Sequence, residues 1–326
     1  MPKKRRQIEV PQHWTTFAWQ GFSVRVPPEW TPASLTGGED EGYFRIDGPD
    51  QPRVEAKWAT SRGFVDVDGV VRKYFRTLTR GRAGKDVKIR EKVKLSVPMP
   101  KERSSVKTFG WRGEQEALGV AWYCRECGRV TLVQVLGRPG EDLQALAEKI
   151  LSTFRDHTDG QWRRWALYEL DCQVPKDFKL VSQEYLTGLL RLSFERGRDK
   201  LTIVRWGLAN VALKSTSLKN WLMSKNRKAW RPFNVRLEEE HIHGHQGLAI
   251  SGESAVPFMH LFGVGVRLLG RRWPTALRGA AWVCEQGNKI YHVEAVIDPS
   301  EEGMIAEVIY RLRCHREAGS SATADK

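Results

Sequence analysis

Several features that would narrow the function of this chain at once are scarce or missing. There are only 5 cysteines in 326 residues, an odd number that forms no disulfide framework and favours a reducing compartment. The longest apolar run, 255–270, contains Arg267 and is shorter than the roughly 18 to 20 residues that a membrane-spanning helix needs. No apolar segment follows the basic start of the chain, so no signal peptide is expected. These absences predict a soluble, cytoplasmic protein without a transmembrane segment.

The short motifs of common enzymes are absent as well. The chain contains no G-x-S-x-G nucleophile elbow, no Walker A loop, no dinucleotide-binding glycine fingerprint and no H-E-x-x-H helix. It also has no signature of an RNA-recognition, KH or helix-turn-helix module. The sequence therefore favours a protein that is not an enzyme and that does not read a nucleic-acid sequence.

Acidic residues are few relative to basic ones, with 39 Asp and Glu against 53 Lys and Arg and a net charge of +14. Such a balance points to an anionic partner, either nucleic acid or an acidic protein. The excess is concentrated in residues 72–94 and 191–231, and Trp221 and Trp230 in the second stretch could stack on bases. The predicted anion-binding residues are Arg72, Lys73, Arg76, Arg80, Arg82, Lys219, Lys225, Arg227, Lys228 and Arg231.

What the chain does contain is an internal repeat. Residues 121–136 (AWYCRECGRVTLVQVL) return without a gap at 281–296 (AWVCEQGNKIYHVEAV). Each copy shows two alternating apolar runs around a short polar turn, which predicts a β-hairpin. Matches such as Trp14 with Trp162 and Trp58 with Trp206 extend the repeat toward the N-terminus. We interpret the chain as a duplicated α+β unit of about 145 residues.

Each repeat is expected to form one antiparallel sheet covered by two helices. In the first half, alternation predicts strands at about 14–19, 22–26, 42–47, 53–59, 87–97 and 106–111 before the hairpin, and apolar stripes predict helices at 67–78 and after Pro139. In the second half, strands are expected at about 162–167, 170–174, 188–194, 200–206, 233–241 and 246–252, and helices at 215–224 and after Pro299.

The order of these elements resembles the PsbP-like fold, shared by the photosystem II extrinsic protein P and the Ran-binding nuclear import factor Mog. The resemblance is carried by Gly21 to Trp30 (GFSVRVPPEW), by the hairpin, and by Ile150 to Arg155 (ILSTFR). It implies two tandem binding or assembly modules, since no catalytic constellation is common to that fold. The expected divisions are a basic N-terminal end (1–10), a first domain (11–157), a second domain (158–316) with an apolar insertion (255–278), and a disordered tail (317–326).

Two groups of residues are candidates for a metal site. Cys124 and Cys127 form a C-x-x-C before Gly128 and resemble a zinc knuckle. They could instead be a redox or disulfide pair, or inert thiols. The second copy keeps Cys284 but has Gly287 in place of the other cysteine, which favours a packing position for Cys124 and Cys284.

The other group is His241, His243 and His245, which alternate along a predicted strand. Alternation would place the three rings on one face, where they could share a metal or could simply face solvent. The sequence thus predicts a non-enzymatic protein with basic faces. A zinc-binding protein and a docking factor that uses 255–278 as a protein interface are the alternatives.

Overall fold

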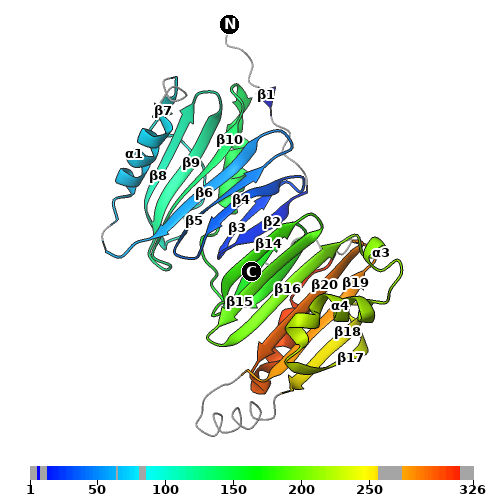
Figure 1. Ribbon diagram of the computed structural model, residues 1–326. Helices are drawn as coiled ribbons and strands as arrows, with labels where there is room; N and C mark the ends of the chain where they lie inside the picture. The colour runs from blue at the N-terminus through cyan, green and yellow to red at the C-terminus, as the bar shows by residue number, and fades with distance from the viewer. Residues whose placement is uncertain (1–5, 8–12, 64, 81–85, 256–273, 316–326) are drawn as a thin grey trace. The chain divides into compact units, whose positions relative to one another are not determined.

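The computed structural model describes residues 6–7, 13–63, 65–80, 86–255 and 274–315 (Figure 1). The chain divides into two compact units. Unit 1 comprises residues 1–160 and 164–168, and unit 2 comprises residues 161–163 and 169–326. Within the described residues, no helix combines the length and the apolar character that a membrane span requires.

Unit 1 is built on a seven-stranded antiparallel sheet with the order β4-β5-β6-β10-β9-β8-β7. Its strands are β4 (Thr31–Gly37), β5 (Glu41–Asp47), β6 (Pro52–Thr60), β7 (Lys88–Arg90), β8 (Arg103–Arg112), β9 (Glu116–Cys124) and β10 (Arg129–Gly137). A smaller hairpin of β2 (Thr15–Trp19) and β3 (Phe22–Val26) is extended by β12 (Trp162–Leu167) through Ala18 and Ala166. A short parallel pair joins β1 (Arg6–Gln7) to β11 (Glu141–Asp142).

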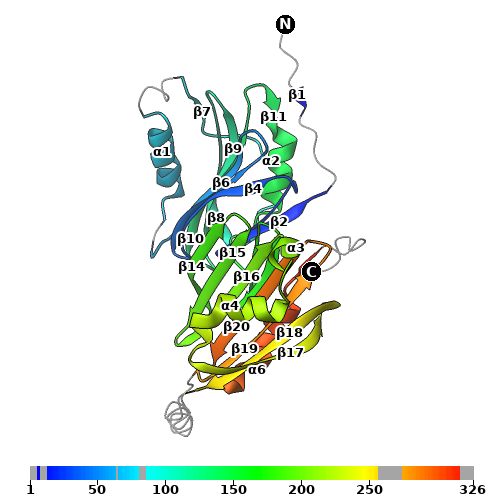
Figure 2. The same cartoon turned by 45° about the vertical axis from the view of Figure 1, so that its right-hand side comes forward.

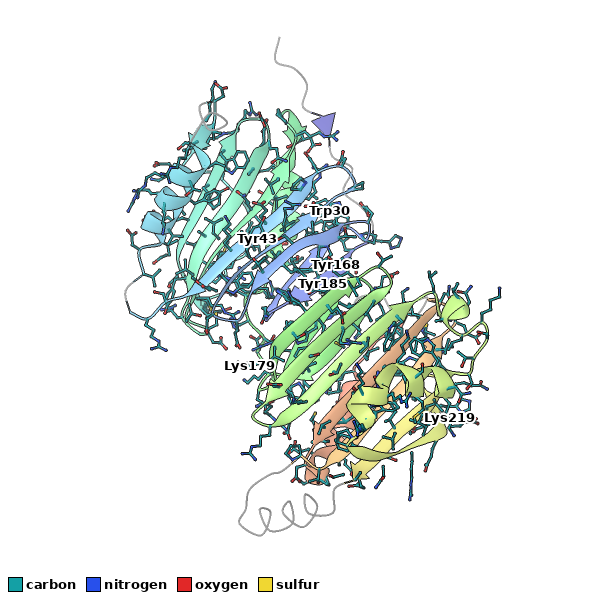
Figure 3. All side chains as sticks on the ribbon, in the orientation of Figure 1. Trp30, Tyr43, Tyr168, Lys179, Tyr185 and Lys219 are labelled. Carbon is teal, nitrogen blue, oxygen red and sulfur yellow. The ribbon has the colours of Figure 1, made fainter. Side chains whose placement is uncertain are left out.

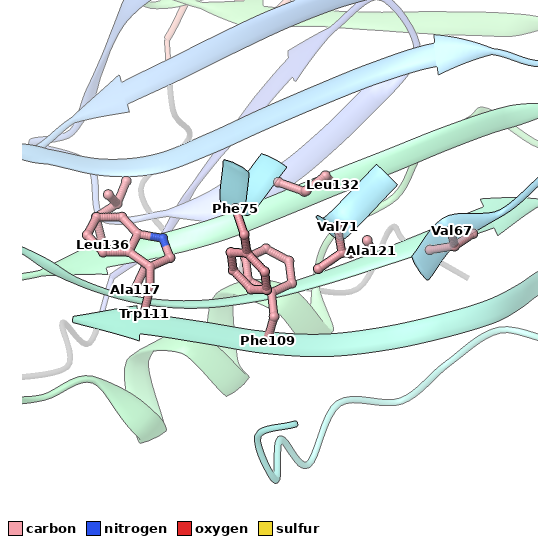
Figure 4. Packing of buried hydrophobic residues seen from close by; sticks show 9 residues of the cluster. All are labelled: Val67, Val71, Phe75, Phe109, Trp111, Ala117, Ala121, Leu132 and Leu136. Atoms are coloured by element: carbon pink, nitrogen blue, oxygen red, sulfur yellow. The ribbon is translucent and has the colours of Figure 1, made fainter. Parts of the chain in front are cut away.

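The two helices of unit 1 lie on opposite faces of the main sheet (Figure 2). Helix α1 (Val67–Leu78) buries Val71 and Phe75 against Phe109 and Ala121 (Figure 4). Alternate residues of β9 point to the other side, where Trp122 meets the ring of Phe154 just after helix α2 (Leu143–Ser152). The residues that follow α2 are therefore held against the end of β9.

Unit 2 is built on a second seven-stranded antiparallel sheet, and its order is β14-β15-β16-β20-β19-β18-β17. The strands of this sheet are β14 (Lys179–Leu186), β15 (Leu189–Arg196), β16 (Asp199–Gly207), β17 (Phe233–Ile242), β18 (His245–Ser254), β19 (Ala276–Cys284) and β20 (Lys289–Ile297). Strand β13 (Leu170–Pro175) precedes them in the chain and lies outside the sheet. Its helices are α3 (Ala209–Ala212), α4 (Leu218–Trp230), the 3₁₀ turn η1 (Pro299–Glu301) and α6 (Glu302–Tyr310).

Helix α4 covers one face of this sheet. Trp221 and Leu222 pack with Leu248, Leu277 and Ala281, which lie on β18 and β19. Even-numbered residues of β19, among them Trp282 and Cys284, point to the opposite face because side chains alternate along a strand. Helix α6 contacts β19, β20 and β13, so the residues that follow it reach the end of β19.

The structure confirms a mostly β, α+β protein with two antiparallel sheets, and it corrects several predicted elements. The strand expected at 87–97 is only β7, and residues 91–100 leave the sheet in a segment that contains Pro98 and Pro100, which have no N–H to donate. The helix expected at 215–224 runs from Leu218 to Trp230. The edge strands β4 and β14 were not predicted, since their polar and apolar residues do not alternate cleanly.

Candidate functional site

The predicted basic residues of the first half lie on and just after α1. Arg72, Lys73, Arg76 and Arg80 are all exposed to solvent. Arg72 donates to Asp66 at 3.0 Å, and Asp66 also caps the helix by accepting from the backbone N–H of Gly69. Arg82 lies outside the described residues. The positive charge of α1 is thus partly balanced by Asp66 at the start of the helix.

The basic residues of the second half form a more uniform surface, the α4 face, which consists of the exposed side chains of Lys219, Lys225, Arg227, Lys228 and Arg231. Lys219 extends outward from α4 in Figure 3. No acidic residue occurs from Lys200 to Leu237, and none of the five cations forms an ion pair with a residue that the structure describes. The α4 face is therefore an unbalanced cationic surface.

The tryptophans of this stretch do not face solvent. Trp221 is 8 % exposed and Trp230 is 4 % exposed, and both pack under α4. The indole N–H of Trp230 donates to Glu294 at 2.6 Å. The expectation that these rings stack on bases is wrong, because they form the core beneath the helix.

In unit 1, the thiol of Cys124 lies in a buried polar cluster at the end of β9. Its Sγ is 3.5 Å from Nδ1 of His157. Nδ1 of His157 also lies 3.4 Å from Asp156, whose other oxygen accepts from the indole N–H of Trp122 at 2.7 Å. We call Arg103, Cys124, Asp156 and His157, with Cys127 at the adjoining turn, the unit 1 cluster.

A permanent cation, the guanidinium of Arg103, occupies the centre of this cluster. Arg103 donates to Asp156 at 3.3 Å and to the carbonyl of Phe154 at 2.7 Å, and its side chain is 1 % exposed. The guanidinium carbon lies 4.1 Å above the ring of Trp122, a cation–π distance. The charge of Asp156 is therefore already compensated by protein groups.

The electrostatics of the cluster follow from these contacts. The hydrogen bonds from His157 to Asp156 and Cys124 raise the pKa of His157 to about 11. Burial alone would raise the pKa of Asp156, but His157, Arg103 and Trp122 outweigh it and hold that pKa below its usual range. Contact with Cys127, and then with His157, lowers the pKa of Cys124 to about 5. These shifts favour a charged imidazole at His157 next to the sulfur of Cys124.

A cysteine beside a histidine has the composition of a catalytic nucleophile and its base. The burial of Cys124 argues against that role. Cys124 is 0 % exposed, so a substrate atom has no route to its sulfur in this conformation. Cys127 is half-buried at the turn after β9, and burial and the contact with Cys124 raise its pKa. The two cysteines of the C-x-x-C do come together with Asp156 and His157.

In unit 2, the three predicted histidines do not share one strand face. Strand β17 ends at Ile242 and β18 begins at His245, so His243 and Gly244 form the two-residue turn between them. Both turn residues have positive φ, 52° and 76°, as a tight hairpin turn requires. His241 is exposed, and Nε2 of His243 lies 2.7 Å from the carbonyl of Ile309. The predicted geometry of this trio is wrong because the turn breaks the alternation.

His245 instead meets three residues that are distant in the sequence. Nε2 of His245 is 3.3 Å from Sγ of Cys314 and 3.3 Å from Nδ1 of His315. Nδ1 of His315 is 3.2 Å from Sγ of Cys314 and 3.6 Å from Sγ of Cys284. We call His245, Cys284, Cys314 and His315 the unit 2 cluster, and all four ligand atoms lie within 4.8 Å of one another.

The two cysteines of the unit 2 cluster are buried, with Cys284 0 % exposed and Cys314 7 % exposed. Burial lowers the pKa of His245, and the neighbouring rings of His315 and His243 lower it further. Burial raises the pKa of Cys314 to about 11, against the opposing effect of the indole N–H of Trp282. That N–H makes no hydrogen bond of normal geometry within the described residues.

Sequence reasoning did not identify this cluster. Cys284 was interpreted as a packing residue, and Cys314 and His315 were not considered as ligands. Their spacing gives no local motif, since 39 and 30 positions separate His245, Cys284 and Cys314. One signal was available: the Cys314-His315 pair follows the last helix where the first half has Asp156-His157.

The apolar insertion predicted at 255–278 lies mainly outside the described residues. Its last part does not belong to an insertion, because Ala276 to Arg278 form the start of β19 and pair with β18. The register joins Ser251 to Arg278 and Glu253 to Ala276.

Comparisons with known proteins give matches to solved structures only. No protein-family model and no curated protein matches the chain. A structure of the Tle4–Tli4 complex matches at 9 % identity and a TM-score of 0.34, covering 92 % of this chain and 97 % of that one. The immunity protein TplEi of the type VI secretion system of Pseudomonas aeruginosa matches at 9 % identity and a TM-score of 0.31, covering 92 % and 96 %.

A third match is MucB in complex with MucA, at 9 % identity and a TM-score of 0.18, covering 90 % of this chain and 81 % of that one. The resemblance to the PsbP-like fold is wrong. The matching solved structures include immunity proteins and MucB, and the chain folds around two seven-stranded antiparallel sheets.

Proposed function

We propose that this chain is a non-enzymatic binding protein and that its α4 face binds an acidic protein. The observation that carries the proposal is the set of five exposed cations on and beside α4, with no acidic residue from Lys200 to Leu237. Side chains of one sign on a rigid helix attract an oppositely charged partner and orient it. Helix α4 is rigid because its inner face is anchored by Trp221, Leu222 and Trp230.

An acidic protein is favoured over nucleic acid by what accompanies the cations. Binding of single-stranded nucleic acid usually combines a cationic groove with exposed aromatic rings, and Trp221 and Trp230 are buried. The large exposed apolar side chains in and directly before α3 and α4 are aliphatic or thioether groups, namely Leu208, Val211 and Met223. Such groups are typical of a protein–protein contact surrounded by charge.

The absence of an enzymatic role belongs to the same proposal. The pKa shifts of Cys124, Asp156 and His157 need no substrate to explain them, because burial and the contacts among these residues account for them. A cytoplasmic location is proposed as well, supported by the five free thiols and tested by fractionation of cells that produce the chain.

A binding assay with defined probes tests the α4 face. The probes are a fluorescent oligoglutamate peptide and a fluorescent single-stranded oligonucleotide of equal charge. We expect the triple variant Lys225→Glu, Arg227→Glu, Lys228→Glu to weaken peptide binding by about tenfold or more, and salt to weaken binding to the unmodified chain.

The matched control is Arg72→Glu, Lys73→Glu, Arg76→Glu, which changes the net charge by the same amount on α1. It should leave peptide binding within about twofold, because the Debye length at physiological salt confines the effect to nearby charges. Equal losses from both triple variants, tighter binding of the oligonucleotide, or insensitivity to salt would overturn the proposal.

We also infer that the two units arose by duplication of one α+β unit, with domains at 11–157 and 158–316. The ungapped repeat and the equal strand order of the two seven-stranded sheets support this inference. Alignment of related sequences tests it: if the two halves resemble each other no better than unrelated sheets of the same order, the inference fails.

A further inference from the structure

We propose that the unit 2 cluster is a structural zinc site whose four ligands are His245, Cys284, Cys314 and His315, and that unit 1 replaces this metal by the Arg103–Asp156 ion pair. The proposal does not depend on the α4 face, because it rests on different residues. It names a ligand set that brings together three separate parts of unit 2.

The spacing of the ligand atoms is that of a tetrahedral site. With Zn–S of about 2.3 Å and Zn–N of about 2.0–2.1 Å, tetrahedral ligand atoms lie about 3.3 to 3.8 Å apart. The observed separations are 3.3 Å between the two histidine nitrogens and 3.2, 3.3 and 3.6 Å for the printed sulfur–nitrogen pairs. Uncharged side chains that merely pack together also lie at these distances. The residue types of the four ligands therefore have to decide whether the cluster binds a metal.

The composition of the set matches zinc. Two thiolates and two imidazoles are a common ligand set for structural zinc, which requires four protein ligands and no open position. Two thiolates balance the charge of the ion, so the buried site would be neutral. A hard cation such as magnesium or calcium would require oxygen ligands, and the unit 2 cluster offers none.

The surrounding residues complete the case for a metal. The indole N–H of Trp282 makes no hydrogen bond of normal geometry within the described residues, but it lies close enough to Cys314 to act on its sulfur, whereas the equivalent N–H of Trp122 donates to Asp156. A thiolate at Cys314 would provide an acceptor, and hydrogen bonds to ligating sulfur are typical of such sites. The carbonyl of Cys314 accepts from Tyr291 at 3.0 Å, which fixes the backbone at this ligand.

The unit 1 cluster occupies the matching place in its own sheet. Arg103 begins β8 and pairs with Cys124 at the end of β9, as His245 begins β18, the neighbour of β19, which Cys284 ends. Asp156 and His157 follow α2 as Cys314 and His315 follow α6. Unit 1 also brings four ligand atoms together, from Cys124, Cys127, Asp156 and His157. There, however, the guanidinium of Arg103 is bonded to the carboxylate of Asp156, so a fixed cation already compensates the cluster.

Metal analysis of the purified full chain tests the proposal. We expect about one zinc per chain by mass spectrometry, and loss of that zinc in Cys314→Ser. The controls Cys124→Ser and Cys172→Ser, in unit 1 and in β13, should retain it. Cobalt exchanged into the unmodified chain should show the intense absorption of tetrahedral cobalt with thiolate-to-metal charge transfer.

A second variant separates loss of metal from loss of folding. In His245→Arg combined with Cys314→Asp, unit 2 receives the ion pair of unit 1. We expect this double variant to bind no zinc and to unfold more cooperatively than Cys314→Ser, because the new cation and carboxylate compensate each other. Less than about a tenth of an equivalent of metal in the unmodified chain, zinc retained in Cys314→Ser, or zinc lost only in Cys124→Ser would overturn the proposal.

Discussion

The two units place different chemistry at the same point of the same strand order. In unit 1 the ends of β8 and β9 and the segment after α2 meet around Arg103 and Asp156. In unit 2 the ends of β18 and β19 and the segment after α6 meet around two cysteines and two histidines. In both units the segment after the last helix is fastened to the end of the sheet. Unit 1 does this with a guanidinium–carboxylate pair, and unit 2 does it with a set of thiol and imidazole groups.

The difference between them lies in where the positive charge comes from. Unit 1 carries its cation covalently, so its cluster is complete as soon as the chain folds. Unit 2, on our proposal, takes its cation from solution, so its stability depends on free zinc and on any competing chelator. The four predictions below test this contrast, beginning with the largest expected effect.

Removal of the fixed cation should have the largest effect. In Arg103→Ala the buried carboxylate of Asp156 loses its guanidinium partner and keeps only His157 and Trp122, which should destabilise unit 1 by about 3–5 kcal/mol. Native-state hydrogen exchange of peptides from each unit measures this separately for the two. The control Arg76→Ala, an exposed arginine of α1, should change stability by less than about 0.5 kcal/mol. Equal effects of the two variants would contradict a central role for Arg103.

Removal of the metal should have a somewhat smaller effect, confined to unit 2. If zinc is present at about a thousandfold over its dissociation constant, a chelator should lower the stability of unit 2 by about 4 kcal/mol. Hydrogen exchange in β18, β19 and the residues after α6 should accelerate, and unit 1 should show no change. Faster hydrogen exchange in unit 1 alone would contradict a metal in unit 2 and would place it in unit 1.

A change of pH should act on the units in opposite directions. The pKa of His157 is raised to about 11, so its stabilising effect is complete below about pH 6.5 and is lost as pH rises through about 11. The pKa of Asp156 is lowered, so its contribution is lost only as pH falls through its folded-state pKa. The pKa of Cys124 is lowered to about 5, so its contribution is present at neutral pH and is lost as pH falls through about 5. Unit 2 should weaken in mild acid, because protons compete with zinc for its ligands.

Thermal or denaturant unfolding followed by hydrogen exchange at about pH 6, 7.5 and 10 measures this crossing, because the acid point then lies above the pKa of Cys124. We expect unit 2 to be the first to open at the acid end and unit 1 to be the first at the alkaline end. Parallel loss in both units across the range would show that the two clusters are electrostatically alike.

The smallest effect is expected at the C-x-x-C. Cys127→Ser should cost less than about 1 kcal/mol and should leave the zinc content unchanged, because Cys127 is half-buried at a turn and its place in unit 2 is taken by Gly287. Metal analysis of this variant beside Cys314→Ser measures the difference. Loss of zinc in Cys127→Ser would place the metal in unit 1.

The elements that the sequence predicted closely are helix α1 and the hairpin of β9 and β10. Helix α1 repeats its apolar residues along one buried stripe. Strands β9 and β10 are buried on both faces, and their apolar runs are marked off by the polar turn between them. The edge strand β4 contains Pro32 and was missed, since proline is tolerated only where a strand lacks a second partner. The length of α4 was underestimated because its polar C-terminal half is anchored by Trp230 alone.

The candidate sites were predictable only in part, for a physical reason. Charge excess is a property of composition, so the cations of α4 could be found in the sequence. The unit 2 cluster depends on strand pairing and on the path of the chain after α6, which bring His245 and His315 together across 70 positions. Spacing along the chain does not contain that information, and the attractive trio of histidines was separated by a turn that needs positive φ.

The order of ligands along the chain has a consequence for biosynthesis. A ribosome delivers His245 and Cys284 well before Cys314 and His315, so the early pair has at most half of a coordination shell while translation continues. Metal capture can then be completed only after the segment beyond α6 has emerged and docked, which makes it a late, long-range step with a high loop-closure cost. During that interval the imidazole of His245 and the thiol of Cys284 stay free to react with other metals or oxidants. On our proposal, the cellular supply of zinc would then set how soon unit 2 reaches its folded state.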